Sequence, residues 1–308
     1  MTWAWSLPVT LVPTRPSLAS PLRANATRVV VPTYRDWDDA RRTIESLLRC
    51  RPRPADIVLV DDNAEDTPPA WVARSPITFV SYRGNRGPAY ARNAGACAPS
   101  DRRIDWLYFT DGGCERDPGF FGELEAASHL ARRGTIAIAA PVAGQVTCPK
   151  ATPINHYMTV EAILCPPRDL HGPQAIVTAN AAVYAPTFRA SGGFCTLFPT
   201  AAGEDLDLGL RLRSTGWIGW AERAVVRHAF AEDELDFVRR FERYGAGNAR
   251  LERLWGMSSL RPAPFRAATP ELQRLADLQV EAMRRGYDLV KLGSPLDEPS
   301  RPVAHPSA

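Results

Sequence analysis

The sequence shows no surplus of charge of either sign and almost no lysine. Its 308 residues include 37 basic and 34 acidic side chains, so the formal net charge is only +3, and the only lysines are Lys150 and Lys291. A chain with nearly balanced charge has no general attraction to polyanions. We therefore do not expect nucleic acid as a partner.

The cysteines form no recognisable metal or disulfide pattern. The six of them are scattered from Cys50 to Cys195, without a Cys-x-x-Cys pair and without the spacing of zinc ligands. Reduced thiols are typical of cytoplasmic proteins. A cytoplasmic location is therefore the one we expect.

Long hydrophobic runs are also missing. A membrane-spanning helix needs about 20 predominantly apolar residues, and no window of the sequence offers them. The opening segment lacks a basic start and is interrupted by Pro8, Pro13 and Pro16, which is not typical of a signal peptide. The sequence thus predicts no transmembrane segment, while peripheral contact with a membrane is left open.

What the sequence does contain is a set of strand-like runs that end in polar residues and follow one another in a fixed order. The runs are RVVVPTYR at 28–35, DIVLVDDN at 56–63 and DWLYFTDGG at 105–113, and the acidic segment GED follows at 203–205. Buried parallel strands deliver polar residues at their carboxyl ends, where α/β sheets bind ligands. This order predicts an α/β fold with a mostly parallel central sheet flanked by helices.

Hydrophobic periodicity gives approximate positions for the other elements. Helices are expected at 37–50, 88–97, 117–132, 233–255 and 269–287, and strands at 77–81, 135–140 and within 174–186. The many prolines of 141–174 predict a loop over one end of the sheet. Residues 205–213 alternate at period two, which by itself favours a strand there.

Taken together, the motifs resemble the family-2 glycosyltransferases, inverting enzymes of the GT-A fold. VVVPTYR is similar to the family's first strand, IVLVDDNAEDTP to its second strand and acidic loop, NRGPAYARNAG to a helix opening beside the nucleotide, and LYFTDGGCERDPGF to its Asp-x-Asp segment. TANAAVYAPTFRASGGF, GEDLDLGLRLRSTGW and AVVRH are similar to the acceptor-side loop, the helix of the catalytic base and a strand ending in histidine. The resemblance covers roughly residues 28–230, and it predicts a helix at 205–213 in place of a strand.

Composition and resemblance together divide the chain and imply its ligands. An irregular arm at 1–26 precedes a GT-A-like catalytic domain at 27–230, which is followed by a helical region at 231–292 and a disordered tail at 293–308. The resemblance implies a nucleotide-diphosphate sugar donor, with a UDP-sugar favoured over GDP- or dTDP-sugars, and an acceptor that carries a hydroxyl group.

Inverting glycosyl transfer is an in-line displacement at the anomeric carbon. An acceptor hydroxyl attacks while the nucleoside diphosphate leaves from the opposite face, through a transition state that resembles an oxocarbenium ion. The reaction needs a base for the hydroxyl and positive charge for the leaving group. The resemblance assigns the base to Asp205 and an orienting role to Glu204, and the alternative for Asp205 is a simple cap of the following helix.

The resemblance also implies nucleotide contacts along the first two strands. Asp62 matches a residue that accepts the N–H of the base, Tyr34 and the backbone near Pro32 flank the base, and Arg92 reaches the nucleotide. The alternative for Asp62 is a turn after a strand, which Asp and Asn favour in any case.

Asn180 and the turn at Gly192 and Gly193 match the segment that lines the donor and acceptor pocket. The alternative is a hydrogen-bonded Asn in an apolar strand, followed by a glycine turn. In the C-terminal helix, Phe237, Phe241 and Tyr244 are spaced as a core face, with arginines between them that are solvated or seek phosphate.

The sequence departs from the family at the metal motif, where two carboxylates one residue apart position Mg²⁺ or Mn²⁺ on the diphosphate. Asp111 is present, but Gly113 stands where the second carboxylate belongs. His228 matches a histidine that reaches the metal or the diphosphate, and Glu115 is a weaker substitute for the missing acid. Side-chain cations and helix N-termini are the alternative to a bound metal.

Two other functions compete with a transferase. A nucleotidyltransferase also uses an α/β sheet, but the segment VPTYRDWDD after the first strand is acidic and lacks a glycine-rich, basic phosphate loop. A catalytically inactive nucleotide-sugar-binding protein would explain the missing second carboxylate, but the retained Gly203-Glu204-Asp205 argues against it.

Overall fold

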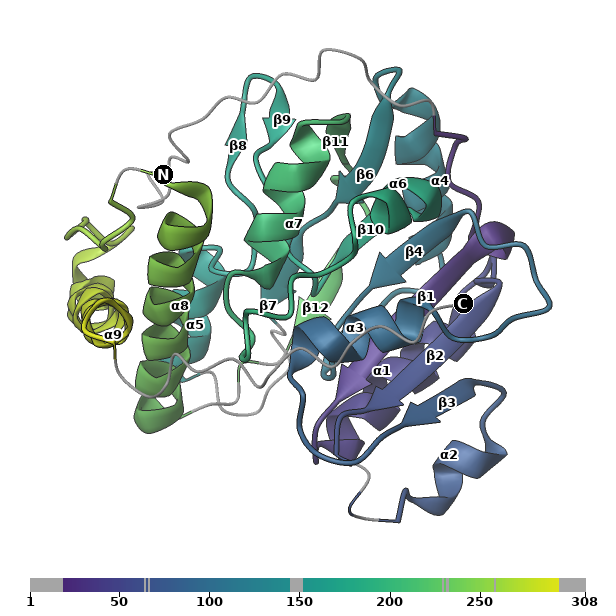
Figure 1. The fold of residues 1–308 in the computed structure, drawn as a ribbon, viewed down its shortest axis with the longest axis horizontal. Coiled ribbons are helices and arrows are strands. Elements are labelled where there is room, and N and C mark those ends of the chain that lie inside the picture. The colour runs from purple at the N-terminus through teal and green to yellow at the C-terminus, as the bar shows by residue number, and fades with distance from the viewer. Residues whose placement is uncertain are drawn as a thin grey trace.

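The computed structural model is an α/β structure with a central twisted sheet (Figure 1). It describes residues 19–293 apart from 64, 66, 145–151, 229, 231, 232 and 258. The expected arm at 1–26 therefore lies mostly outside the described residues, and so does the expected tail at 293–308 apart from its first residue. Within the described chain, no helix has the length and hydrophobicity needed to span a bilayer.

The central sheet has seven strands in the order β11-β6-β10-β4-β1-β2-β3. Their bounds are Trp217–Trp220 for β11, Thr135–Ala139 for β6, Ala181–Tyr184 for β10, Trp106–Phe109 for β4, Thr27–Thr33 for β1, Asp56–Asp61 for β2 and Thr78–Ser81 for β3. All pairs are parallel except those of β10, which runs antiparallel to both neighbours. The mostly parallel sheet is confirmed, although the strand expected within 174–186 is short.

Alternate residues of the strands feed two separate cores. Val29 and Val31 of β1 pack in one cluster with helices α1 (Trp37–Arg49) and α4 (Phe120–Leu130), whereas Val30 packs in another with α3 (Pro88–Ala96) and α7 (Glu204–Arg213). Helices therefore cover both faces of the sheet, as apolar strands without an exposed face require.

The strand that the period-two pattern favours at 205–213 is wrong, because this segment is helix α7. The family resemblance predicts this helix. Leu208 and Leu212 lie one turn apart and pack on the sheet, while Leu210 packs on the other side with Phe198 and Leu251. A helix buried on two sides carries apolar residues on both, and such a pattern can mimic the alternation of a strand.

The described part of the proline-rich segment 141–174 is more ordered than the expected loop. It contains β7 (Val142–Gly144), α5 (Pro153–Val160) and the short hairpin of β8 (Arg168–Asp169) and β9 (Gly172–Pro173). Thr152 caps α5 by accepting a hydrogen bond from the Asn155 N–H at 3.1 Å, and a proline suits the first helical position. A second sheet, in the order β5-β12-β7, joins β7 to β5 (Cys114–Arg116) and β12 (Val226–His228).

The C-terminal helices α8 (Glu234–Trp255) and α9 (Gln273–Lys291) are in backbone contact. A Cβ atom at Gly245 would lie 1.8 Å from the Met283 carbonyl oxygen, and one at Gly286 would lie 1.9 Å from that of Glu242. Gly247 of α8 is also close to Ala202, where a Cβ atom would lie 2.6 Å from the carbonyl oxygen. Helix α8 is thereby fixed against the segment that opens α7.

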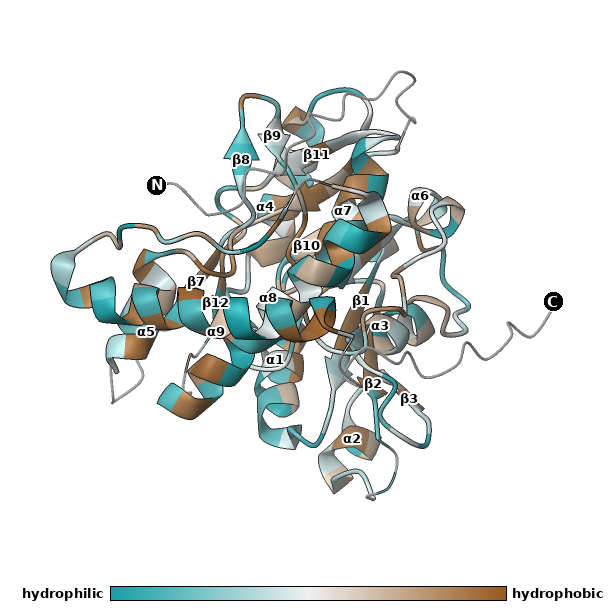
Figure 2. Ribbon diagram, turned by 60° about the vertical axis from the view of Figure 1, so that its left-hand side comes forward, coloured by the Kyte–Doolittle hydropathy of each residue, from teal (hydrophilic) through white to brown (hydrophobic). Residues whose placement is uncertain are grey.

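The remaining helices are short. They are α2 (Ala70–Arg74), α6 (Ala185–Ala190) and the 3₁₀ turns Ala24–Ala26 and Pro270–Leu272. In Figure 2, helices α7 and α9 alternate between hydrophilic and hydrophobic segments, as expected of helices that pack on part of their circumference.

Candidate active site

A buried arginine joins three elements at the carboxyl edge of the sheet. Arg92 of α3 is only 2% exposed, and its two terminal nitrogens donate hydrogen bonds of 2.8 Å to Asp111, after β4, and to Glu204, at the start of α7. The guanidinium also lies over the Phe194 ring, 5.7 Å from its centroid. Two carboxylates thus pair the charge of Arg92, as its burial requires. The contact of Arg92 with a nucleotide stays a prediction.

Glu204 and Asp205 occupy the first turn of α7, where the helix dipole favours negative charge. The helix begins at Gly203, whose φ of +94° suits glycine and lets the chain turn sharply into the helix. Asp205 Oδ1 accepts a 2.9 Å hydrogen bond from the N–H of Leu206. Glu204 is buried, and its Oε2 has no hydrogen-bond partner among the described residues.

This cluster contains more carboxyl groups than guanidinium groups, because Arg92 is the one arginine buried with Asp111, Glu204 and Asp205 among the residues described above. Burial raises the pKa of Asp205 to about 7, the charge of Glu204 acts in the same direction, and Arg92 opposes both. Burial also raises the pKa of Glu204, although Arg92 counteracts it. Asp205 keeps part of its surface exposed, so it can exchange its proton with a ligand. A carboxyl group with a pKa near neutrality is suited to accept a proton.

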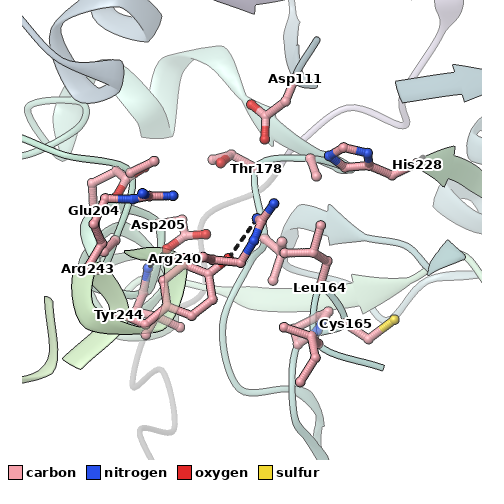
Figure 3. Close-up of a pocket in the computed structure, with 18 of the residues that line it drawn as sticks. Asp111, Leu164, Cys165, Thr178, Glu204, Asp205, His228, Arg240, Arg243 and Tyr244 are labelled. Carbon is pink, nitrogen blue, oxygen red and sulfur yellow. Dashed lines mark hydrogen bonds between the residues drawn. The ribbon is translucent and has the colours of Figure 1, made fainter. Parts of the chain in front are cut away.

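The cluster forms one side of a pocket of about 170 Å³. Figure 3 shows Asp111 and His228 toward one end, Tyr244 of α8 toward the other, and both Asp205 and the head of Arg240 in the space between. Asp111 after β4 therefore meets residues of α7, β12 and α8 in one space, although it lies about 90 or more positions before them in the sequence.

Five of the predicted site residues line this pocket, namely Arg92, Asp111, Glu204, Asp205 and His228. The other six, which do not line it, are Pro32, Tyr34, Asp62, Asn180, Gly192 and Gly193. Pro32 and Tyr34 lie at the carboxyl end of β1, between the ends of β2 and β4, and Tyr34 is 44% exposed.

Asp62 is bound by the backbone of the loop that opens α3. Its two oxygens accept hydrogen bonds from the N–H groups of Arg86 at 2.8 Å and Gly87 at 2.9 Å, and the residue is 4% exposed. Burial raises the pKa of Asp62, and these hydrogen bonds oppose the rise. Asp62 therefore positions the helix that carries Arg92.

Asn180 takes a structural position, in line with the alternative stated for it. It is 1% exposed, accepts a hydrogen bond from the Tyr108 hydroxyl and donates to the carbonyl oxygens of Pro141 and Ala224. Because β10 begins at Ala181, residue 180 is drawn into the sheet, and Thr178 and Ala179 line the pocket instead. The turn at Gly192 and Gly193 packs on Asn93 of α3, which hydrogen-bonds the backbone of Phe194.

The described residues provide no cluster of three or more side chains that could hold a metal by themselves. Asp111 has one oxygen bound by Arg92, and the space next to Gly113 is filled by Asp39, whose carboxylate would lie 3.2 Å from a Cβ atom at that position. Mg²⁺ often uses only one or two carboxylates, with phosphates and water as its other ligands. Asp111 and His228 line the same pocket, and an ion bound there would need further ligands such as diphosphate oxygens.

Several lining residues were not identified from the sequence. They are Arg240, Arg243 and Tyr244 of α8, and Ile163, Leu164, Cys165, Pro166 and Pro167 after α5. The arginines follow the core residues Phe237 and Phe241 along the helix, so the sequence shows which face of the helix they lie on. It does not show which part of the protein that face contacts. The segment after α5 carries no polar motif that could have marked it.

The comparison with protein families agrees with this architecture. Residues 28–157 match the model described as Glycosyl transferase family 2, and residues 161–284 match the model described as Glycosyl transferase family group 2. The two matches span most of the described chain. The chain belongs to the family-2 glycosyltransferases.

Individual relatives are more distant. The succinoglycan biosynthesis protein ExoO of Rhizobium meliloti (strain 1021) is 40% identical over 78 residues, which are 24% of this chain and 22% of that protein. The chain therefore matches under a quarter of the length of this relative.

Solved structures support the fold. The mannosyltransferase PcManGT from Pyrobaculum calidifontis, in complex with GDP-Man and Mn²⁺, has a TM-score of 0.53 and 16% identity, covering 94% of this chain and 80% of that one. S. aureus TarS 1-349 in complex with UDP has a TM-score of 0.51 and 13% identity, covering 87% and 92%. The GT-A-like fold expected from the sequence is confirmed.

Proposed function

We propose that this chain transfers a sugar from a nucleotide-diphosphate donor to a hydroxyl acceptor, with inversion at the anomeric carbon and with Asp205 as the general base. The observation that carries the proposal is the partly exposed Asp205, with a pKa raised to about 7, in the same pocket as Asp111. An isolated helix cap would not need this surrounding cluster of charges.

The chemistry follows from the positions of these groups. The acceptor oxygen forms a bond to the anomeric carbon while its proton passes to the Asp205 carboxylate, and the bond from that carbon to the diphosphate oxygen breaks. The departing diphosphate keeps the electron pair. Glu204 accepts a hydrogen bond from Arg92, and its charge raises the pKa of Asp205, which makes Asp205 a stronger base.

The nucleotide is proposed to lie along the carboxyl ends of β1 and β2. Tyr34 is exposed there, with the Arg35 guanidinium 5.3 Å from its ring centroid, and Pro32 and Asp62 border the same edge. Asp62 contributes chiefly by fixing the α3 loop, although a carboxylate oxygen can accept a further hydrogen bond from a base. A UDP-sugar remains the favoured donor, and the GDP-Man and UDP complexes of the similar structures make both bases worth testing.

Asp111 and His228 are the residues proposed to hold Mg²⁺ or Mn²⁺ together with diphosphate oxygens. Such an ion supplies positive charge to the leaving group when it is bound. Arg92 keeps Asp111 oriented in its absence, through the 2.8 Å hydrogen bond to Oδ1.

The test is a turnover assay with UDP-, GDP- and dTDP-sugars, with EDTA or with added Mn²⁺, alongside a thermal-shift titration of the nucleoside diphosphates. We expect one donor to be consumed and its nucleotide to raise the melting temperature. Nucleotide binding without turnover on any donor would instead identify an inactive binding protein, and release of sugar 1-phosphate, with transfer of the nucleoside monophosphate, would identify a nucleotidyltransferase.

A further inference from the structure

The turn that carries Asp111, residues 110–114, is closed by an arginine that does not line the pocket. Arg116 of β5 donates two hydrogen bonds of 2.9 Å from the same terminal nitrogen, Nη2, to the Thr110 hydroxyl oxygen and to the Cys114 carbonyl oxygen. Thr110 and Cys114 are the first and last residues of this turn. A single guanidinium nitrogen therefore joins its two ends.

The Thr110 hydroxyl extends this connection to a second part of the pocket. It accepts from Arg116 and donates a 3.0 Å hydrogen bond to the Ala179 carbonyl oxygen. Ala179 lines the pocket, as does Asp111, the residue after Thr110. Arg116 thus acts on two lining segments through one hydroxyl group, although it does not reach the pocket itself.

Helix α1 supports the backbone of the same turn. The Thr43 hydroxyl donates to the Asp111 carbonyl oxygen at 3.2 Å and accepts from the Cys114 N–H at 3.0 Å. These bonds hold the middle and the end of the turn. The link from Arg116 adds the first residue, Thr110, and with it the connection to the pocket wall.

The charge of Arg116 is buried without a carboxylate to pair it. The residue is 4% exposed, and its Nε and Nη1 atoms have no hydrogen-bond partner in the part of the chain that the structure describes. Its guanidinium lies 5.7 and 5.5 Å from the ring centroids of Tyr108 and Phe120, whereas the buried Arg92 is paired with two acids. A buried charge of this kind costs free energy, and an apolar side chain in its place is often no less stable. Stability alone therefore does not explain an arginine here.

We propose that Arg116 is a positioning residue for the diphosphate end of the pocket. It keeps the turn of residues 110–114 closed, so that Asp111 and the Ala179 backbone hold the spacing that the diphosphate and its ion require. The turn needs this support because it contains Gly112 and Gly113, and glycine backbone is costly to order. The inference rests on the proposed function, since it places the diphosphate beside Asp111.

The experiment compares three substitutions with a matched control. Arg116→Met removes the charge, Arg116→Lys keeps it, and Thr110→Val removes the hydroxyl while preserving the shape. Arg227→Gln is the control, because Arg227 lies on the adjacent strand β12 with an exposed side chain that pairs with Asp117. For each full-length variant, calorimetry measures the affinity for UDP with Mn²⁺ and for uridine, thermal unfolding gives Tm, and turnover gives kcat/KM for the donor. GDP and guanosine are the probes if the wild type prefers GDP.

We expect Arg116→Met to lower UDP affinity and donor kcat/KM by about 10- to 100-fold, the usual effect of losing a residue that orients a ligand-binding side chain. Uridine affinity should stay within about twofold of wild type, since the base is proposed to lie along β1 and β2. Tm should stay the same or rise, because an unpaired buried charge is removed. Arg116→Lys should recover part of the lost affinity, and Arg227→Gln should change none of these quantities.

The double variant Arg116→Met/Thr110→Val tests whether the two residues act together. Both single changes remove the same hydrogen bond, so the double variant should lose less UDP affinity than the product of the two single effects. Single effects that multiply would overturn the proposal, because Arg116 would then act independently of Thr110.

Two results of Arg116→Met would also overturn the proposal. A lower Tm, with UDP and uridine affinity lost together, would make Arg116 a residue of the core alone. Unchanged UDP affinity and kcat/KM would show that the turn does not need it. A failure of the proposed function is recognised differently, because the wild type would then bind no nucleoside diphosphate, and the role of Arg116 would fall with it.

Discussion

Asp62 and Asp205 are two buried or partly buried acids near the same edge of the sheet, yet their surroundings differ. Both oxygens of Asp62 are bound by backbone N–H groups, at 2.8 and 2.9 Å. Asp205 accepts one backbone N–H, from Leu206, and faces a pocket beside the negative Glu204. The first carboxylate is used to hold a loop, whereas the second keeps the capacity to take up a proton.

The two acids are connected through helix α3. Asp62 fixes Arg86 and Gly87, which lead into the helix, and the helix carries Arg92 to Asp111 and Glu204. The nucleotide edge of the sheet therefore supports the geometry of the pocket. A substitution at Asp62 should disturb structure first, whereas one at Asp205 should disturb chemistry first.

The largest contrast is expected from Asp205→Asn. The amide cannot accept the hydroxyl proton, so turnover should fall by about 10²- to 10⁴-fold. UDP binding, measured by calorimetry, should remain close to wild type because Asp205 does not hold the nucleotide in this account. Loss of folding in this variant, measured by circular dichroism, would favour the helix-cap interpretation.

Removal of Arg92 should have the next largest effect, on stability. Arg92→Gln leaves the buried Glu204 without its counter-charge, and such a loss costs about 3–5 kcal/mol. Denaturant unfolding measures the change, with Arg83→Gln as a control on the exposed loop before α3. Equal stability of the two variants would show that the Arg92 bridge does not support the cluster.

Asp62→Asn should have a smaller effect, because the asparagine side chain keeps one acceptor oxygen and loses the other. One of the N–H groups of Arg86 and Gly87 is then left without an acceptor, at a cost of about 1–3 kcal/mol. We expect lower stability and a higher KM for the donor, with kcat changed less. A loss in kcat as large as that of Asp205→Asn would remove the distinction between the two acids.

The smallest expected effect is on the pH dependence of stability. Because folding raises the pKa of Asp205 from 3.8 to about 7, the folded state binds this proton more tightly, and its contribution to stability falls as pH rises through 7. Asp205→Asn cannot ionise, so from pH 6 to pH 8 it should lose less stability than wild type. The difference is on the order of 1 kcal/mol, or about 2 °C in Tm. Identical pH profiles of Tm would contradict the raised pKa.

The sequence predicts the sheet and the acids well because both depend on local pattern. The strands before Asp62 and Asp111 are continuous apolar runs that stop at polar residues, and parallel topology brings such ends to one edge. The antiparallel direction of β10 could not be predicted, because strand direction depends on the path of 141–174 and not on the residues of the strand. The structural position of Asn180 follows from that same path.

The α8 wall of the pocket shows a different limit. Its periodicity identifies Phe237 and Phe241 as core residues, but it does not show that Arg240 and Arg243 line the pocket, on a helix that Gly247 lets contact Ala202. A close approach of two distant backbones has no signature in a single sequence beyond the glycine itself. The side chains of that wall could not be predicted from the sequence, because their place in the pocket depends on tertiary packing.

The central claim is that Asp205 acts as the base, and the pH dependence of kcat/KM for donor turnover tests it most directly, because this ratio reports the ionisation of the free enzyme. The account predicts that kcat/KM rises about tenfold per pH unit at acidic pH and levels off near pH 7, the pKa to which Asp205 is raised. The residual activity of Asp205→Asn should lack this rise. A wild-type profile that is flat from about pH 5 to 9, or a variant that keeps the same rise, would contradict the claim.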